Sequence, residues 1–186
     1  MNLKELEGRL RRLEDRESIR ALVARYGQVV DDRDMRGIEA LFAADAVFRT
    51  RGGEMNAIGL AAVMDNFRSR FASMTASNHF ANDHIITFDT DDEAQGFVTS
   101  HAEVVRDGRA MLVAMRYDDR YRRIGDQWKF AKREVSFFYY VPAARFAELL
   151  PIRERVYGYG EPVAADWPEA TPTYRQYEKD HPRASD

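Results

Sequence analysis

Apolar positions in the first 30 residues recur at the three- and four-residue steps of an α-helix. The stripe consists of Leu3, Leu6, Leu10, Leu13, Ile19, Leu22, Val23 and Tyr26. Such a face is expected to pack on a sheet or on a second subunit. Asp15 with Ser18 gives a capping signal inside the stretch, which therefore predicts either one helix or two helices with a bend.

Two shorter helical patterns follow. The acidic cluster at residues 31–34 ends the first apolar run, and Ile38, Leu41 and Phe42 then share one face of a short predicted helix. A strand is expected to start at residues 46–48, and residues 60–72 repeat the helical period.

From residue 77 onward the period changes to two, which is typical of strands. The predicted strands cover residues 80–88, 97–105, 111–121 and 128–141. Asp107-Gly108 and Gly125-Asp126 are good hairpin turns, and the acidic run at residues 89–93 is interpreted as a solvated turn. Helices at the N-terminal end and antiparallel strands at the C-terminal end predict an α+β fold with a curved, mostly antiparallel sheet.

The composition changes after residue 142, where a short apolar helix is expected. The last 36 residues hold five of the six prolines. They also carry the aromatic residues Tyr157, Tyr159, Trp167, Tyr174 and Tyr177. A disordered tail rarely has so many aromatic side chains. We therefore expect residues 1–150 to form one domain and residues 151–186 to form an extension that packs on it or on a neighbouring subunit.

Charge and composition narrow the function classes. The formal net charge is −3, so no basic field attracts nucleic acid or an anionic membrane. The chain has no cysteine, which excludes disulfides and thiolate chemistry. Nucleotide-binding glycine motifs and the HExxH zinc motif are absent. These observations predict a soluble cytoplasmic protein without a metal or an organic cofactor.

Candidate chemistry rests on a few polar residues. His79, His84 and His101 lie in predicted strands, and a strand histidine is more often a hydrogen-bonded core residue than a base. Asp31 lies where a helix ends, and helix termination with solvation of the carboxylate would by itself explain an aspartate at this position. Arg133 shares a strand face with apolar residues, where an arginine is costly unless it is paired.

Three runs of sequence resemble the SnoaL-like family of the nuclear transport factor 2-like superfamily. ARYGQVVDDRDMRGIEALFAADAVF resembles its first helical segment, NHFANDHIITF its histidine-bearing strand, and YDDRYRRIGDQWKFAKREVSFFYYVP its final hairpin. The resemblance covers roughly residues 5–150. It implies a cystatin-like α+β cone, and it implies members that are dehydratases, dehydrochlorinases, isomerases, cyclases or non-catalytic binders, commonly homotrimers or homodimers.

The resemblance implies roles for individual residues. Asp31, rather than its neighbour Asp32, falls at the family's dyad aspartate, and His79 falls at the dyad histidine. Tyr26 matches the tyrosine of the dehydratases and Arg133 the pocket arginine of the dehydrochlorinases. His101 lies where one dehydratase has a second histidine, although its flanking residues differ. The first-strand tyrosine of the dehydratases has no counterpart at residues 48–50.

An aspartate–histidine dyad fits a cofactor-independent lyase. Histidine takes a C–H proton while the carboxylate fixes its tautomer, and Tyr26 or Arg133 assists the leaving group. Phe48, Phe137 and Tyr139 are the expected substrate-binding residues for a small aromatic or alicyclic hydroxylated molecule. Retro-aldol or deformylating cleavage, double-bond isomerisation, polyketide-type cyclisation and non-catalytic ligand binding stay open as alternatives.

Overall fold

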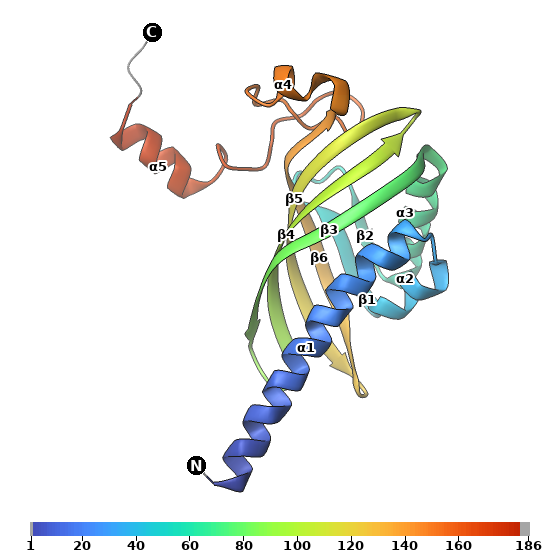
Figure 1. Ribbon diagram of the computed structural model, residues 1–186, viewed down its shortest axis with the longest axis vertical. Helices are drawn as coiled ribbons and strands as arrows, with labels where there is room; N and C mark the ends of the chain where they lie inside the picture. The colour runs from blue at the N-terminus through green and yellow to red at the C-terminus, as the bar shows by residue number, and fades with distance from the viewer. Residues whose placement is uncertain (1, 183–186) are drawn as a thin grey trace.

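A long curved sheet with helices against one face forms the body of the protein in the computed structural model, which describes residues 2–182 (Figure 1). Within these residues the sheet has six strands in the order β2-β1-β6-β5-β4-β3. The strands are β1 (Phe42–Thr50), β2 (Asn56–Ile58), β3 (Met74–Phe88), β4 (Glu93–Arg106), β5 (Arg109–Ile124) and β6 (Gln127–Pro142). β1 pairs with β6 in parallel, and the remaining pairs are antiparallel. The predicted α+β class with a curved, mostly antiparallel sheet is confirmed.

Three helices cover the concave face. They are α1 (Leu3–Asp31), α2 (Met35–Leu41) and α3 (Leu60–Ser73). The core lies between them and the sheet, where Ile19, Val30, Ile38 and Phe67 are buried. The short elements η1 (Ala143–Arg145) and α4 (Phe146–Leu149) follow β6, and α5 (Pro172–Asp180) extends away from the body (Figure 1).

Several predicted bounds change. Phe42 starts β1 instead of ending a helix face, because its backbone is already extended at the end of α2. β3 begins at Met74, three residues before the period of two becomes visible in the sequence, and the hairpin strands are also longer than predicted. The turns at Asp107-Gly108 and Gly125-Asp126 are present, with positive φ at Asp107, Gly108 and Gly125.

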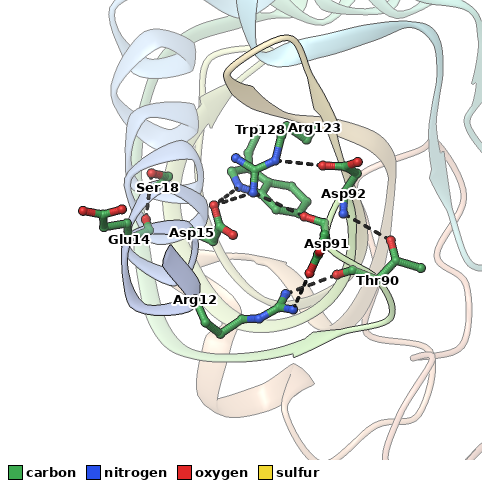
Figure 2. Close-up of polar contacts among 9 residues, drawn as sticks. All are labelled: Arg12, Glu14, Asp15, Ser18, Thr90, Asp91, Asp92, Arg123 and Trp128. Atoms are coloured by element: carbon green, nitrogen blue, oxygen red, sulfur yellow. Dashed lines mark hydrogen bonds and ion pairs between the residues drawn. The ribbon is translucent and has the colours of Figure 1, made fainter. Parts of the chain in front are cut away.

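α1 is one uninterrupted helix, so Asp15 does not start a second one. Asp15 instead accepts hydrogen bonds from Arg123 Nη2 at 2.5 Å and from Trp128 Nε1 at 3.2 Å (Figure 2). Arg123 also contacts Asp92 in the β3–β4 turn. Burial alone would raise the pKa of Asp15, but the bonds from Arg123 and Trp128 outweigh it and lower that pKa. These contacts connect the middle of α1 to the β5–β6 hairpin and, through Arg123, to the β3–β4 turn.

Replacing this carboxylate is expected to destabilise the fold and to change its acid response. Asp15→Asn should lower the free energy of unfolding by about 1.5–3 kcal/mol, because the hydrogen bonds lose their charge. A depressed pKa stabilises the fold above the pKa of the unfolded state, near 4, and that stabilisation is lost as pH falls through the folded value. Urea unfolding at pH 7 and pH 3 measures both effects. If the variant and wild type differed as much at pH 3 as at pH 7, the linkage would be contradicted.

The tail from residue 151 to residue 171 packs on the end of β6. Tyr140 and Val156 form a parallel bridge, and Phe137 exchanges hydrogen bonds with Asp166. The Trp167 ring stacks on Phe138 with centroids 4.8 Å apart. These contacts hold residues 151–171 against the end of β6.

Candidate active site

Asp31 and His79 meet where the C-terminal end of α1 crosses β3. Asp31 Oδ1 lies 2.6 Å from His79 Nδ1, and Asp31 Oδ2 accepts the His79 backbone N–H at 2.7 Å. The histidine side chain is 7% exposed and the aspartate side chain 18%. Burial alone would raise the pKa of Asp31, but the side-chain and backbone bonds from His79 outweigh it and lower that pKa.

The charge of Asp31 determines the tautomer of His79. An ionised carboxylate only accepts hydrogen bonds, so Nδ1 must carry the proton. The neutral imidazole then has its lone pair on Nε2, which makes no hydrogen bond to a described residue. The neighbouring Asp32 is exposed and caps α1 through its backbone. Of the two adjacent aspartates, only Asp31 contacts the histidine.

A bulge in β3 brings a second histidine to the concave face. The pairing register of β3 with β4 shifts between Ala81 and His84, so His79 and His84 both point inward despite their odd spacing. His84 Nε2 contacts Tyr121 Oη at 3.0 Å, and burial lowers the pKa of His84 to about 4. His84 is therefore a neutral member of the core near pH 7.

His101 lies on the other face of the sheet. The inward positions of β4 are the even-numbered ones from Ala94 to Val104, so His101 is exposed and contacts Asn82 Oδ1 at 3.1 Å. The expected place of His101 in the substrate pocket is not what the structure shows, because strand alternation turns this side chain outward.

Arg133 is held by a carboxylate that the sequence analysis did not identify. Its Nε and Nη2 donate to Asp119 at 2.9 and 2.8 Å, and both side chains are almost fully buried. Tyr121 Oη donates to the same carboxylate at 2.8 Å. Asp119 and Tyr121 both lie on the inner face of β5. The period of two in that strand was the sequence signal that could have placed Asp119 on this face.

Aromatic rings surround the Arg133 guanidinium. Its Cζ lies 4.2 Å from the Tyr26 ring centroid, 4.0 Å from Tyr117 and 4.2 Å from Phe130. Tyr26 in turn meets the His79 ring edge-on at 6.5 Å. The structure thus brings Tyr26, Arg133 and the Asp31–His79 pair into one neighbourhood.

Two cavities share a wall made by Tyr26, His79 and Tyr117. The inner cavity is narrow, with a volume of about 20 Å³, and the side cavity is larger, at about 400 Å³. It is lined by Tyr26, Phe48, Arg70, Met74, His79, Ala102, Val104, Arg106, Val113, Met115, Tyr117, Val135, Phe137, Tyr140 and Tyr159. The side cavity is lined by Val23, Ala24, Tyr26, Gly27, His79, Phe80, Ala81, Asn82, Val98, Ser100, Tyr117 and Arg133. Arg133 therefore lines the side cavity and not the inner cavity.

Phe48 and Phe137 line the inner cavity, and Tyr140 lines it where the sequence analysis placed Tyr139. A bulge lies at Phe138, since Ala114 pairs with Tyr139 while Met115 pairs with Phe137. The extra residue reverses the alternation beyond it. Tyr139 consequently packs on Phe146 outside the cavity, with ring centroids 5.2 Å apart.

The tail completes the inner cavity. Tyr159 lines it beside Tyr140, and burial raises the pKa of Tyr159 to about 12, so the phenol stays neutral. Gly158 lies flat on Tyr140, where a Cβ would fall 2.5 Å from Cδ1. Arg106 donates to the Gly158 carbonyl and, at 3.4 Å, to Tyr140 Oη. Tyr159, from the tail, is thus part of the cavity wall.

Within residues 2–182, no group of three or more histidine, aspartate or glutamate side chains is arranged to hold a metal ion. The part of the chain that the structure describes also has no helix long and apolar enough to span a membrane.

Comparison with solved structures supports the same fold. The hexachlorocyclohexane dehydrochlorinase of Novosphingobium barchaimii superposes with a TM-score of 0.66 at 23% identity, covering 73% of this chain and 94% of the other. A protein of Novosphingobium aromaticivorans, provisionally assigned as a scytalone dehydratase, gives 0.66 at 19% identity, with 71% and 89% covered. A second protein of that organism, provisionally assigned as an aromatic ring hydroxylase, gives 0.64 at 30% identity, with 67% and 90% covered.

No curated protein sequence matches the chain. The family profile of the SnoaL-like domain matches residues 11–134, which include α1 from residue 11 onward, the sheet up to the middle of β6, and both members of the Asp31–His79 pair. The match spans most of the chain, and the fold agrees with it. The chain therefore belongs to the SnoaL-like domain family, within the nuclear transport factor 2-like superfamily.

Proposed function

We propose that this protein is a cofactor-independent lyase in which His79 removes a C–H proton from a small aromatic or alicyclic hydroxylated substrate. The observation that carries the proposal is the double contact of Asp31 with His79 at the wall of the inner cavity, at 2.6 and 2.7 Å. Dyad geometry of this kind serves proton transfer, whereas ligand binding alone does not require it. The dehydrochlorinase fold neighbour, itself named for an elimination, agrees with this reaction class.

In the proposed elimination, His79 Nε2 takes the proton and the electron pair of the broken C–H bond forms the new C=C bond. The C–O bond to the leaving hydroxyl breaks at the same time or afterwards. Asp31 stabilises the imidazolium through Nδ1–H. The leaving hydroxide receives a proton from the Tyr26 hydroxyl or from His79 itself, so water is the second product.

Arg133 has a different part in this proposal from the one the family resemblance implies. Its Nε and Nη2 groups both donate to Asp119, and its Cζ lies 4.2 Å from the Tyr26 ring centroid. A guanidinium fixed over the face of an aromatic ring holds that ring in place. We propose Arg133 as a positioning residue behind Tyr26.

A panel of aromatic diols and alicyclic alcohols, followed by ultraviolet absorbance, tests the reaction class because elimination creates new conjugation. Wild type is expected to convert at least one member, with mass spectrometry showing loss of one water. Conversion without a change in mass would instead indicate isomerisation or cyclisation. Binding without turnover across the panel and related halides would favour a non-catalytic binder.

We further propose that the protein is a homo-oligomer, a trimer or a dimer. The first part of α1 extends beyond the sheet (Figure 1), and its apolar stripe is uncovered: Leu3, Leu6, Leu10 and Leu13 are 71%, 48%, 54% and 64% exposed. A contiguous apolar row on a helix is typical of an interface. Light scattering after size-exclusion chromatography is expected to give two or three times the chain mass, and a monomeric mass at micromolar concentration would overturn the proposal.

A further inference from the structure

The inner cavity contains positive charge with no acid to balance it. Among the described residues that line it, two are arginines, Arg70 and Arg106, and none is an aspartate or a glutamate. The carboxylate of Glu54, which affects Tyr159 electrostatically, lies outside the lining and accepts a hydrogen bond from Thr50. An unbalanced cation in a largely apolar cavity is costly unless a counter-ion enters.

Arg106 is already occupied. It donates to the Gly158 carbonyl and the Tyr140 hydroxyl, and its Nε lies 3.5 Å from Ser73 Oγ. Its visible role is to hold the tail against β4. Arg70, by contrast, lies in the last turn of α3 and makes no side-chain hydrogen bond or ion pair with any residue in the range 2–182.

Aromatic contacts do not account for Arg70 either. Its Cζ lies 5.8 Å from the Phe48 centroid and 5.7 Å from the Phe67 centroid, close to the limit at which a cation–π contact contributes. The other internal arginines show the contrast: Arg133 is paired with Asp119, and Arg155 with Glu169. Arg70 is half-buried at the cavity, and the N–H groups of its guanidinium are available to a ligand.

We infer that the substrate carries a carboxylate, which binds Arg70 in the inner cavity and so presents the rest of the molecule to His79. The inference rests on the proposed lyase function and narrows it to hydroxy acids. A planar guanidinium binds a planar carboxylate through two parallel N–H···O bonds. One free arginine fits one carboxylate, and the hydroxyls of Tyr26 and Tyr159, which also line the cavity, are neutral donors for the remaining lone pairs.

Matched ligand pairs test this inference without knowledge of the true substrate. Benzoate and cyclohexanecarboxylate are titrated calorimetrically against benzamide and cyclohexanecarboxamide, which have the same shape without the charge. The wild-type protein is expected to bind each acid at least about tenfold more tightly than its amide. Equal affinity for acid and amide in wild type would overturn the inference, whatever any variant does.

Variants assign the effect to Arg70. Arg70→Gln should weaken binding of the acids by about tenfold to hundredfold while leaving the amides within about threefold of wild type. Arg68→Gln is the matched control, because Arg68 lies on the same helix, is exposed and pairs with Asp65 on the surface; it should bind as wild type. Thermal melting confirms that each variant is folded. Unchanged acid binding in folded Arg70→Gln would contradict the inference.

One further variant separates this inference from the lyase proposal. His79→Ala should keep the preference for acids while losing turnover. Loss of turnover in His79→Ala together with no acid preference in wild type would support the lyase proposal and contradict the substrate carboxylate. Acid preference in wild type together with full turnover in His79→Ala would support the substrate carboxylate and contradict the proposed role of His79.

Discussion

His79→Ala is expected to lower kcat on the true substrate by about 10²–10⁴-fold, because general base catalysis of a C–H cleavage contributes an effect of that size. Asp31→Asn should cost a similar factor: an amide no longer stabilises the imidazolium, and its NH₂ group can turn toward Nδ1 and favour the wrong tautomer. Both side chains are at the edge of the core, so both variants should fold. Initial rates with circular dichroism as a folding check measure this.

A matched control is available in the adjacent aspartate. Asp32→Asn changes the same chemical group one residue further along, at an exposed position that does not contact His79. Its kcat should stay within about threefold of wild type. Near-normal rates for both His79→Ala and Asp31→Asn would mean that the pair is structural.

Asp119→Asn is expected to have the largest effect on stability, lowering the free energy of unfolding by about 3–5 kcal/mol. The reason is that Arg133 would stay buried with no counter-charge, since Asp119 is its bidentate partner. Burial alone would lower the pKa of Arg133, and the charge of Asp119 more than reverses this. Urea unfolding gives the difference.

Two further variants show whether the pairing itself is responsible. Tyr121→Phe removes one hydrogen bond to the same carboxylate and should cost only about 1 kcal/mol. The double variant Asp119→Leu with Arg133→Met replaces both charges by apolar groups and should recover most of the loss, because the desolvation cost disappears together with the attraction. A double variant no more stable than Asp119→Asn would show that the loss arises from packing.

The periodicity of the sequence was sufficient for the elements, and the resemblance to SnoaL-like proteins pointed to the Asp31–His79 pair. Neither was sufficient where a local irregularity decides the direction of a side chain. Periodicity predicted α1, α3 and the hairpin strands, since each buries one regular face. The bulge at Phe138 reverses which of Tyr139 and Tyr140 faces inward, and the bulge between Ala81 and His84 places two histidines at odd spacing on one face. A bulge leaves no clear mark in a hydrophobic pattern.

Long-range charge pairing was the second gap. Asp119 was not identified because its partner Arg133 lies on the next strand, and the period of two that places Asp119 on the inner face of β5 does not identify that partner. Asp15 was interpreted as a helix cap because its true partner, Arg123, is 108 residues away in the sequence. Arg70 looks unremarkable on its helix, and its significance appears only when the sheet and the tail close the cavity around it.

The measurement that tests the central claim most directly follows the substrate's C–H bond in deuterated water. Once the ligand panel yields a substrate, ¹H NMR records loss of the C–H proton and release of product with wild type, His79→Ala and Asp31→Asn side by side. The account predicts proton loss with wild type, about 10²–10⁴-fold slower loss with either variant, and unchanged binding of the acid. Proton loss at the wild-type rate in His79→Ala would contradict it.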